Sequence, residues 1–357
     1  MAKFHALKIK EVKRETKEAV SISFEVPAQL QPEYLFKQGQ YLTLKVKVNG
    51  EELRRSYSIC ASPYSEKELR VAVKEVPGGK VSTYLNQSLK AGDTLEVMTP
   101  MGNFYTPLSG SNKKQYVLFA GGSGITPMMS ILKSVLHIEK NSNVILVYAN
   151  RNEESTIFQS ELEKIQNENS SRFRLVSVFE ESQSQLPSYQ MGRLSTESTL
   201  AVIENHVGLN LDNEFFICGP GPMMENVKNA LQSLNVSNEK IHIEYFSSVI
   251  ENIKKEEEGS TENLVSDVTV IMYGMETTFS LKSDGSTILD AALEAGVDVP
   301  FSCKGAVCCT CRAKVMEGSA KMKANFALTD SEVADGFILT CQAHPTSSKV
   351  IVDYDAL

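Results

Sequence analysis

The sequence predicts three folded units in a row: an antiparallel β-barrel, an α/β unit with a doubly wound parallel sheet, and a smaller α+β unit. Residues 1–110 hold short alternating apolar and polar runs between Pro and Gly turns, and residues 111–246 hold continuous apolar runs between helical patterns. Residues 267–357 combine a hairpin pattern with one capped helix. The charged segment 247–266 predicts an acidic linker, since it cannot bury enough apolar surface to order itself.

The first unit is predicted from four short strand patterns. Turn signals such as Pro77-Gly-Gly79 and Pro100-Met-Gly102 separate them. Several short strands with turns between them favour an antiparallel barrel or sandwich. The predicted strands are Ser21–Val26, Tyr41–Val46, Leu69–Val76 and Thr94–Val97.

The second unit alternates buried strands with helices. One helix is indicated by Met224, Val227, Leu231 and Leu234, which lie on one helical face. Strand–helix alternation predicts a parallel, doubly wound sheet. The predicted strands are Tyr116–Ala120, Val144–Tyr148, Phe173–Val178, Phe215–Cys218 and Ile241–Ile243.

The third unit begins with a predicted hairpin of Val268–Met272 and Thr277–Leu281. A helix over Thr287–Ala295 follows, with Ser286 or Thr287 as its cap and Gly296 at its end.

Charge and hydropathy exclude several classes of partner. The chain of 357 residues carries 36 basic and 44 acidic side chains, and its acidic surplus lies towards the C-terminus, where residues 267–357 hold 7 basic and 12 acidic residues. The first 246 residues are neutral overall, so a nucleic acid partner is not expected. The acidic unit either docks on a basic partner or simply keeps a solvated surface, and the second explanation is the commoner one. No apolar run approaches the ~18–20 residues of a membrane helix, and no secretory signal precedes the first charges, so a cytoplasmic location is expected.

The cysteine pattern is the most specific signal. Five of the seven cysteines lie between residues 303 and 341, which indicates a metal centre in a reducing compartment rather than a disulfide scaffold. The spacing C-x4-C-x2-C, followed by a distant cysteine, is that of a plant-type [2Fe–2S] cluster. It disfavours a zinc site, which usually pairs closer cysteines, and no Cys-x-His pair indicates a Rieske cluster. The predicted ligands are Cys303, Cys308, Cys311 and Cys341, with Cys309 as a non-ligand.

A second motif is the R-x-Y-S box of Arg55, Tyr57 and Ser58. On a strand, Arg55 and Tyr57 point the same way and Ser58 points to the other face. An arginine suits a phosphate, a tyrosine suits stacking on an isoalloxazine ring, and a hydroxyl suits a flavin nitrogen. The segment Gly78–Thr83 strengthens the box, because glycines before a helix bring backbone N–H groups to a pyrophosphate.

A third motif, Ala120–Pro127, directly follows the first buried strand of the second unit. Gly121, Gly122 and Gly124 allow close backbone approach, and Thr126 with Pro127 predicts the cap and first residue of a helix. A glycine-rich turn can also be merely a tight turn. The segment Cys218–Met223 ends another strand and is expected across the same crevice, where open α/β sheets bind ligands. Cys60, by contrast, is expected to be an inert buried thiol.

Together these motifs resemble the ferredoxin–NADP reductase superfamily with a fused C-terminal plant-type ferredoxin, over almost the whole chain. The segments Val76–Ser82, Gly122–Pro127 and Cys303–Cys311 are most similar to the reductase subunits of phenylacetyl-CoA epoxidases, which serve phenylacetate degradation. The resemblance implies an FAD-binding barrel, an NAD(P)-binding α/β domain and a β-grasp ferredoxin domain.

The resemblance also implies roles for individual residues. Arg55, Tyr57, Ser58 and the segment of Gly79, Lys80, Val81 and Ser82 would bind FAD. The loop with Gly122, Ser123, Gly124 and Thr126, and the segment Cys218, Gly219 and Pro220, would seat the nicotinamide nucleotide. Glu244 to Phe246 matches the end of the reductase module, where an aromatic residue often lies near the flavin. The catalytic residues expected on this basis are Ser58, Cys218 and Glu244.

The nucleotide is predicted from the residues after the second buried strand, Asn150 and Arg151. An acidic residue there binds the ribose of NADH, whereas an arginine accommodates the 2′-phosphate of NADPH. NADPH is therefore expected, with NADH as the alternative if Arg151 is only a solvated side chain beside Glu153 and Glu154.

The predicted function is electron transfer from NADPH through FAD and the [2Fe–2S] cluster to a separate oxygenase, because the chain carries no readable oxygen-activating metal site. The expected acceptor is phenylacetyl-CoA epoxidase. Another diiron hydroxylase or a Rieske dioxygenase is the alternative within this class. An iron–sulfur redox sensor is the alternative from another class, and the complete flavin and nucleotide motifs argue against it. A flexible acidic linker would let the ferredoxin unit reach both flavin and acceptor, and a rigidly packed linker is the alternative.

Overall fold

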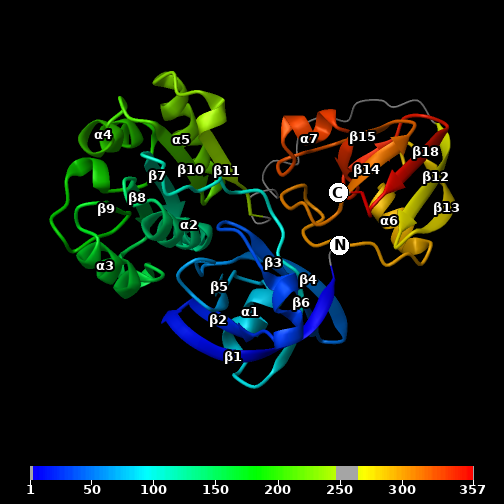
Figure 1. Cartoon of the computed structure of the whole chain (residues 1–357), viewed down its shortest axis with the longest axis horizontal. Coiled ribbons are helices and arrows are strands. Elements are labelled where there is room, and N and C mark those ends of the chain that lie inside the picture. Colours follow the sequence, from blue (N-terminus) through cyan, green and yellow to red (C-terminus); the bar gives the residue numbers. More distant parts are fainter. Residues whose placement is uncertain (1–2, 247–263, 357) are drawn as a thin grey trace. The chain divides into compact units, whose positions relative to one another are not determined.

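The computed structural model describes residues 3–246 and 264–356, so most of the predicted linker lies outside the described residues. The chain forms two compact units (Figure 1). The larger unit contains most of the N-terminal barrel and the α/β domain and ends at Glu244, and the smaller unit contains the C-terminal domain together with residues Arg54–Ser56 of β4 (Glu51–Ser58). The first strand of that domain begins at Val265, inside the segment predicted as a linker.

The N-terminal domain is a six-stranded barrel with the strand order β4-β3-β6-β1-β2-β5. Antiparallel pairs join β1 to β2 and β6, and β2 to β5. A bridge between Ile59, just after β4, and Val71 of β5 joins the two edges of the sheet. The predicted antiparallel barrel is confirmed. Its elements are β1 (Phe4–Thr16), β2 (Ala19–Glu25), η1 (Ala28–Tyr34), β3 (Tyr41–Val48), β4 (Glu51–Ser58), β5 (Leu69–Lys74), α1 (Lys80–Gln87) and β6 (Thr94–Met98).

Two barrel strands, β1 and β4, are not among the four predicted strands. On β1 only Leu7 and Ile9 are fully buried, and the charged second half of the strand shows little apolar alternation. On β4 the six residues from Glu51 to Ser56 include four charged side chains, so only the R-x-Y-S box, which was expected on a strand, indicates this element. Both are strands because neighbouring strands provide their hydrogen-bond partners, which a local pattern does not reveal.

The second domain is a five-stranded parallel sheet with the order β11-β10-β7-β8-β9. Figure 1 shows α2 and α3 on one face and α4 and α5 on the other, so the predicted doubly wound sheet is confirmed. The strand order reverses between β7 and β10, which places a ligand crevice at their carboxyl ends. The elements are β7 (Gln115–Gly121), η2 (Gly122–Gly124), α2 (Ile125–Ile138), β8 (Asn143–Asn150), η3 (Glu153–Ser155), α3 (Gln159–Glu168), β9 (Phe173–Phe179), η4 (Ser188–Gln190), α4 (Thr196–His206), β10 (Asn213–Cys218), α5 (Gly221–Ser233), η5 (Asn238–Lys240) and β11 (Ile241–Glu244).

The start of α2 differs from the prediction. The helix begins at Ile125 with Gly124 as its N-cap, so Thr126 is the second helical residue and Pro127 the third. The hydroxyl of Thr126 donates a 3.0 Å hydrogen bond to the carbonyl oxygen of Ser123 rather than capping the helix. The predicted cap at Thr126 was wrong because the short η2 turn runs directly into α2.

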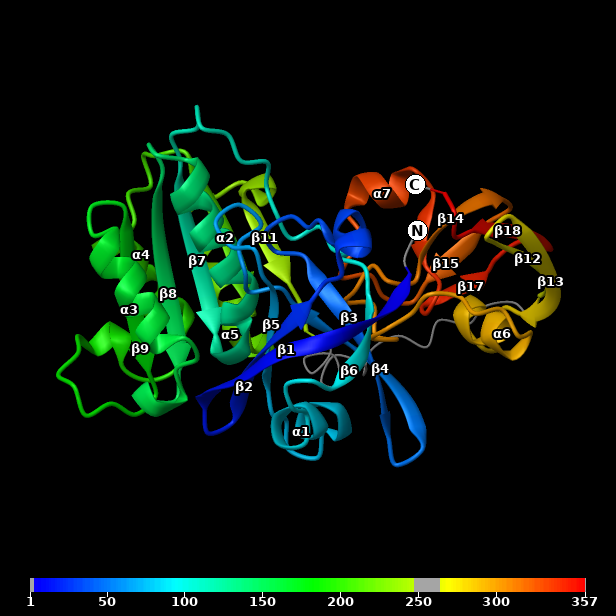
Figure 2. The ribbon, with the colours of Figure 1, turned by 60° about the horizontal axis from the view of Figure 1, so that its bottom comes forward.

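The C-terminal domain has a mixed five-stranded sheet, β13-β12-β18-β14-β16, and a two-stranded sheet of β15 and β17 (Figure 2). The predicted hairpin is confirmed as the antiparallel pair of β12 and β13. Thr287 caps α6, as predicted, by accepting a hydrogen bond from the N–H of Asp290. The elements are β12 (Val265–Met272), β13 (Met275–Lys282), α6 (Ile288–Glu294), β14 (Arg312–Glu317), β15 (Ala320–Met322), α7 (Asp330–Ala334), β16 (Phe337–Leu339), β17 (Ala343–Pro345) and β18 (Lys349–Asp353).

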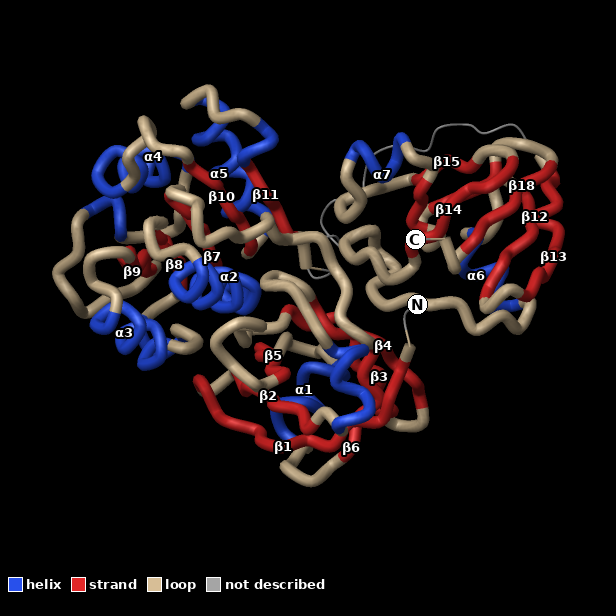
Figure 3. The backbone as a smooth tube through the Cα atoms, in the orientation of Figure 1, coloured by secondary structure: helices blue, strands red, loops and turns tan. Residues whose placement is uncertain are grey.

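The barrel and the C-terminal domain each have an apolar core, and a long loop between α6 and β14 carries Cys303, Cys308 and Cys311 (Figure 3). The core of the barrel includes Leu42, Leu44 and Val97, and that of the C-terminal domain includes Val268, Leu289 and Val352 in its centre. None of the helices in the described parts of the chain is long and apolar enough to cross a membrane.

Candidate functional site: two cofactor regions and a four-cysteine centre

Two glycine-rich loops touch at the carboxyl ends of β7 and β10. A Cβ atom on Gly124 would overlap the carbonyl oxygen of Cys218, and one on Gly219 would lie 2.9 Å from the backbone nitrogen of Gly121. Only glycine permits this backbone-on-backbone contact. The structure therefore brings the predicted segments Gly122–Thr126 and Cys218–Pro220 together in the crevice of the sheet.

The helices that follow these loops leave anion-binding groups available. Within the described residues, no side chain caps the first turn of α2 or of α5. The first N–H groups of a helix have no partner within the helix and carry a partial positive charge, so they bind phosphates. The two loops and two helix starts thus fit the pyrophosphate of a dinucleotide.

Two further side chains support these loops and were missed from the sequence. The side chain of Met223 lies under both loops, since a Cβ on Gly121 would meet its Sδ at 2.7 Å and a Cβ on Gly219 would meet its Cε at 2.7 Å. The buried Tyr148 donates a 3.0 Å hydrogen bond from its hydroxyl to the carbonyl oxygen of Gly122. The only sequence signal for Tyr148 is its position as the polar end of an aliphatic strand.

A second glycine turn precedes α1 in the barrel. Gly78 has a φ of +74°, and a Cβ on Gly79 would lie 2.5 Å from the hydroxyl oxygen of Ser82. That hydroxyl accepts a hydrogen bond from the N–H of Val76 at 3.1 Å and donates one to the carbonyl oxygen of Gly79 at 3.2 Å. Ser82 therefore shapes the turn, while the first N–H groups of α1, at Lys80 and Val81, have no side-chain cap from the described part of the chain. This start of α1 fits a phosphate of FAD.

The R-x-Y-S box lies on β4 with the predicted alternation. Arg55 is exposed, Tyr57 is half-buried and Ser58 is buried. The Arg55 guanidinium donates a 2.7 Å hydrogen bond to the backbone carbonyl oxygen of Arg54, and its remaining N–H groups suit a phosphate. Tyr57 also packs against the barrel core. We refer to Arg55–Ser58 as the flavin box.

Ser58, Glu244 and Cys218 come together although they lie far apart in the sequence. The hydroxyl of Ser58 donates a 3.0 Å hydrogen bond to Oε2 of Glu244. Glu244 stands at the end of β11, directly beside Cys218 at the end of β10 in the parallel register. The barrel and the α/β sheet therefore meet at the three residues predicted to be catalytic.

The surroundings of this trio change the acidity of two of its members. Burial raises the pKa of Glu244 to about 8, although the hydrogen bond from Ser58 opposes the shift. Burial, and then the neighbouring Glu244 carboxylate, raise the pKa of the Cys218 thiol well above its ordinary value. Cys218 thus stays a neutral thiol, and Glu244 exchanges a proton near neutral pH.

Arg151 and Phe246 complete the predicted cofactor residues. Arg151 is exposed after the end of β8, and Phe246 is half-buried two residues beyond β11. Neither acidic neighbour pairs with the Arg151 guanidinium, because Glu153 accepts hydrogen bonds from Ser182 and Ser184 and Glu154 pairs with Lys17.

The four predicted cluster ligands form two pairs in the C-terminal domain. The sulfur atoms of Cys303 and Cys308 lie 3.1 Å apart, and a shared hydrogen bond lowers the pKa of Cys308. Cys311 and Cys341 form the second pair, in which a hydrogen bond from Cys311 lowers the pKa of Cys341. In the described residues no three His, Cys, Asp or Glu side chains converge on one ion. Two pairs fit a two-iron cluster, in which each iron takes two thiolates.

Backbone N–H groups of the ligand loop, Cys303–Cys311, point at these sulfur atoms. The N–H of Gly305 donates to the sulfur of Cys303 at 3.3 Å, and the N–H of Ala306 donates to that of Cys341. Lys304 and Ala306 flank Gly305 with φ angles of +49° and +64°. A left-handed backbone at residues other than glycine is unfavourable. The loop retains it because this conformation directs N–H groups towards negatively charged sulfur.

The side chain of Cys309 belongs to neither of these two cysteine pairs. Its thiol donates a 3.2 Å hydrogen bond to the carbonyl oxygen of Ala327, and its side chain belongs to the apolar core of the domain. This position agrees with its predicted role as a non-ligand. Cys60 is also fully buried, and burial raises the pKa of its thiol to about 12, as expected for an unreactive cysteine.

Family models divide the chain in the same way. Residues 6–105 match an oxidoreductase FAD-binding domain, residues 118–229 an oxidoreductase NAD-binding domain, and residues 270–346 a 2Fe-2S iron-sulfur cluster binding domain. Full-length relatives combine all three. The chain is 40% identical to a subunit of the 1,2-phenylacetyl-CoA epoxidase of Escherichia coli, over all of this chain and 99% of that protein. The chain belongs to the three-domain reductase components of oxygenases.

Other members of this reductase family are named as components of different oxygenases. The ferredoxin reductase component of 3-ketosteroid-9-alpha-monooxygenase from Mycobacterium tuberculosis is 35% identical, over 98% of this chain and 95% of that protein. The glycine betaine monooxygenase reductase subunit of Pseudomonas aeruginosa is 31% identical, over 90% and 88%. Phthalate dioxygenase reductase shares the fold, with a TM-score of 0.58 at 24% identity over 98% of both chains. This reductase is thus an NAD(P)H-dependent electron-transfer oxidoreductase with FAD and a [2Fe–2S] cluster.

Replacing Cys308 by serine in this reductase is expected to abolish the iron–sulfur cluster and to spare reduction of the flavin by the nucleotide, because the two sites use separate residues. Cys309→Ser is the matched control, a neighbouring cysteine that should leave about two irons per flavin. Iron and sulfide analysis and the visible spectrum measure both. Loss of the cluster in Cys309→Ser, or zinc in the anaerobically purified wild-type protein, would refute the ligand assignment.

The pKa of about 8 at Glu244 predicts a pH dependence. Glu244 is protonated below this pH and ionised above it, and its carboxylate would oppose the arrival of electrons on a flavin bound next to Ser58. Flavin reduction by saturating nucleotide should therefore slow as pH rises through about 8. Glu244→Gln should remove the inflection, measured by anaerobic stopped-flow absorbance between about pH 6.5 and 9.5. A variant that keeps the wild-type profile would show that another group titrates.

Proposed function

We propose that this reductase takes a hydride from NADPH at the meeting point of Ser58, Cys218 and Glu244, and passes the electrons through its [2Fe–2S] cluster to a phenylacetyl-CoA epoxidase. The observation that carries the proposed site is the 3.0 Å hydrogen bond from Ser58 to Glu244. It connects the flavin box of the barrel to the sheet edge where the two nucleotide loops touch. Bound FAD would accept two electrons at once from the nicotinamide and release them singly to the cluster.

The residues of the trio have distinct proposed roles. Ser58 is buried and its hydroxyl is oriented by Glu244, so it offers a fixed hydrogen-bonding group to a flavin nitrogen. The neutral thiol of Cys218 has no charge to repel an incoming hydride and places a polarizable atom beside the nicotinamide ring. Glu244, with its raised pKa, supplies or accepts a proton as the charge of the site changes.

Three other groups of residues position the cofactors in this proposal. Arg55 would pair with a phosphate of FAD, Tyr57 would stack on its ring system, and Gly79–Ser82 would receive the pyrophosphate at the start of α1. Gly122–Thr126 with Gly219 and Pro220 would hold the pyrophosphate of the nucleotide, and Phe246 would lie near the flavin. The exposed position of Arg55 and the uncapped helix starts support these assignments.

The proposed preference for NADPH rests on Arg151. Its guanidinium is exposed and unpaired with its acidic neighbours Glu153 and Glu154, so it is available to a 2′-phosphate. Its place after β8, beside the nucleotide crevice, is where this fold meets the adenosine ribose.

Arg151→Ala is expected to lower kcat/KM for NADPH about tenfold and to change kcat/KM for NADH less than twofold, because only NADPH carries the phosphate that loses its partner. Cytochrome c reduction with each nucleotide measures both values. Arg193→Ala is the control, since this arginine is also exposed but pairs with Glu180. Equal values for the two nucleotides in the wild-type protein would remove Arg151 from the site.

The proposal that the acceptor is a phenylacetyl-CoA epoxidase rests on sequence similarity to the Escherichia coli subunit of 1,2-phenylacetyl-CoA epoxidase. This similarity extends over the full chain. Another oxygenase is the second candidate, because relatives of this chain are named as reductase components of monooxygenases with other substrates. The acidic balance of residues 267–357 favours docking on a basic face.

Purified epoxidase oxygenase core should be reduced by this protein, with a rate that falls as ionic strength rises, because salt screens attraction between exposed charges beyond about 10 Å at 0.1 M. Turnover of phenylacetyl-CoA across a salt series tests both points. Turnover that is independent of salt would refute electrostatic docking and keep the acceptor. If the protein reduces cytochrome c but supports no turnover of phenylacetyl-CoA, the reductase belongs to a different oxygenase.

A further inference from the structure

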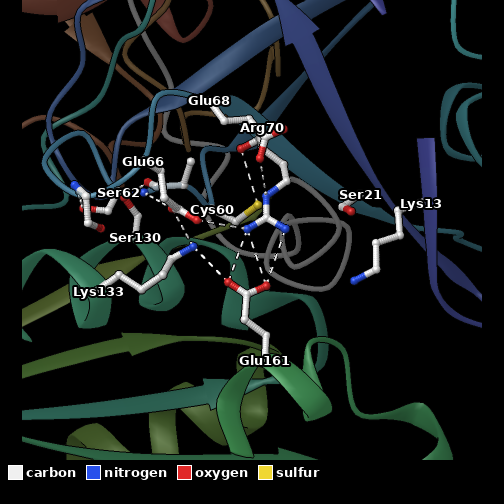
Figure 4. Close-up of polar contacts among 12 residues, drawn as sticks. Lys13, Ser21, Cys60, Ser62, Glu66, Glu68, Arg70, Ser130, Lys133 and Glu161 are labelled. Atoms are coloured by element: carbon white, nitrogen blue, oxygen red, sulfur yellow. Dashed lines mark hydrogen bonds and ion pairs between the residues drawn. The ribbon is translucent and has the colours of Figure 1, made fainter. Parts of the chain in front are cut away.

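Two helices of the α/β domain, α2 and α3, form polar contacts with one segment of the barrel, Ala61–Arg70. Figure 4 shows the side chains involved, which come from this segment and from α2 and α3. All of them belong to the larger compact unit of the chain. None was singled out by the sequence motifs.

Two uncharged contacts join α2 to the barrel. The hydroxyl of Ser130 donates a 2.6 Å hydrogen bond to the carbonyl oxygen of Ala61, and the hydroxyls of Ser134 and Ser62 lie 3.0 Å apart. Ser62, Ser130 and Ser134 are fully buried. Serines four residues apart on one face of α2 thus hold the barrel chain directly after the flavin box.

Four charged side chains extend this contact to α3. The Lys133 ammonium lies 2.7 Å from Oε2 of Glu66 and 3.1 Å from Oε1 of Glu161. The Arg70 guanidinium lies 3.3 Å from Oε1 of Glu161 and 3.4 Å from Oε1 of Glu66. Each cation therefore bridges a barrel carboxylate and an α3 carboxylate. We call Glu66, Arg70, Lys133 and Glu161 the clasp.

The clasp is largely removed from water. The side chains of Lys133 and Arg70 are 10% and 11% exposed, and those of Glu161 and Glu66 are 24% and 25% exposed. Burial alone would raise the pKa of Glu161, but Lys133 and Arg70 outweigh it and hold the pKa below its ordinary value. Removal of one member would leave its mostly buried neighbours with fewer opposite charges, so the network favours one arrangement of the two domains.

The backbone before α3 directs Glu161 into the clasp. Phe158, the residue before the helix, has a φ of +62° and is 2% exposed. A large side chain rarely adopts this left-handed conformation. Here the Arg70 guanidinium lies 5.7 Å from the centroid of the buried Phe158 ring. Phe158 and Glu161 therefore contact the same guanidinium.

Each clasped element continues directly from a proposed cofactor segment. Ala61 stands three residues after Ser58, and β5, which begins beside Arg70, leads to the glycine turn before α1. On the other side, α2 begins right after Gly124, and α3 is the helix that follows Arg151. The clasp therefore joins both proposed flavin segments to the Gly122–Thr126 loop and to the segment of Arg151 through short stretches of chain.

We propose that the clasp is a positioning device for hydride transfer, in which Glu66, Arg70, Lys133 and Glu161 hold the nucleotide loop at reacting distance from the flavin box. The proposal rests on the cofactor placement given above. None of the four residues needs to touch a cofactor for this role. A misplacement of about 1 Å costs on the order of 100-fold in rate when reacting groups must lie about 3–3.5 Å apart.

Glu161→Gln tests the proposal in the purified holoprotein. It removes one of the two carboxylate charges that both cations share and keeps the shape of the side chain. We expect the rate constant for flavin reduction at saturating NADPH to fall about tenfold, with the dissociation constant of NADPH and the FAD content changed less than twofold. The long-wavelength absorbance of a nicotinamide stacked on a flavin should weaken in parallel.

Glu168→Gln is the matched control, because it makes the same substitution on the same helix in an exposed pair with Lys164, 3.9 Å long. It should react like the wild-type protein. Lys133→Met should reproduce the effect of Glu161→Gln, and Lys133→Arg, which restores the charge, should recover most of the rate. A stabilising contact alone would shift the melting temperature and leave the rate and the stacking absorbance unchanged.

Two results would overturn the proposal: a wild-type rate constant in both Glu161→Gln and Lys133→Met, or a rate in Lys133→Arg as low as in Lys133→Met. If Glu161→Gln loses its fold, Ser130→Ala, which removes one hydroxyl, must give the same slowing with intact FAD content. Failure of the cofactor placement itself is distinguishable. In that case Ser58→Ala and Arg151→Ala leave flavin reduction by NADPH unchanged. If only the clasp proposal fails, those two variants slow flavin reduction and the variants of the clasp do not.

Discussion

One hydrogen bond, from the hydroxyl of Ser58 to the carboxyl group of Glu244, connects the two sheets on which the proposed chemistry depends. A barrel that holds one cofactor and a parallel sheet that holds another react only if their edges meet in a fixed arrangement. Ser58 ends a barrel strand and Glu244 ends a strand of the parallel sheet, so each side chain is held by regular structure close to its backbone. The buried charges of Arg70 and Lys133 hold the same two domains together through α2 and α3.

Backbone groups dominate three other binding regions: the nucleotide loops, the glycine turn before α1 and the ligand loop. Gly124 lies against the backbone of Cys218 without a side chain between them, and Gly79 lies against the side-chain hydroxyl of Ser82. In the ligand loop the N–H groups of Gly305 and Ala306 face sulfur atoms. Phosphates and thiolates are both anions, and a backbone N–H is a donor that occupies little space and keeps its place. Side-chain chemistry is therefore concentrated in the trio at the meeting of the two sheets.

The sequence predicted the features that depend on local pattern. The sheet of β7 to β11, the hairpin of β12 and β13 and the cap at Thr287 follow from periodicity and turn residues, and the comparisons bear out the three domains and their cofactors. It did not predict β1 or the start of α2, where neighbouring structure outweighs local preference. Nor did it predict the clasp, because Arg70 and Glu161 are separated by 91 positions and each alone resembles a solvated charge.

The strand order of the parallel sheet has a consequence for the growing chain during synthesis. β7 is the first strand of its sheet to be made, yet one of its two neighbours, β10, is made only about 90 residues later. Until β10 emerges, a continuous apolar strand exposes an unpaired row of N–H and C=O groups. The barrel before it needs only residues up to β6 to close, and so completes its own pairing first. Aggregation during biosynthesis is therefore most favoured after the barrel has closed and before β10 has emerged. It would occur at the unpaired edge of β7.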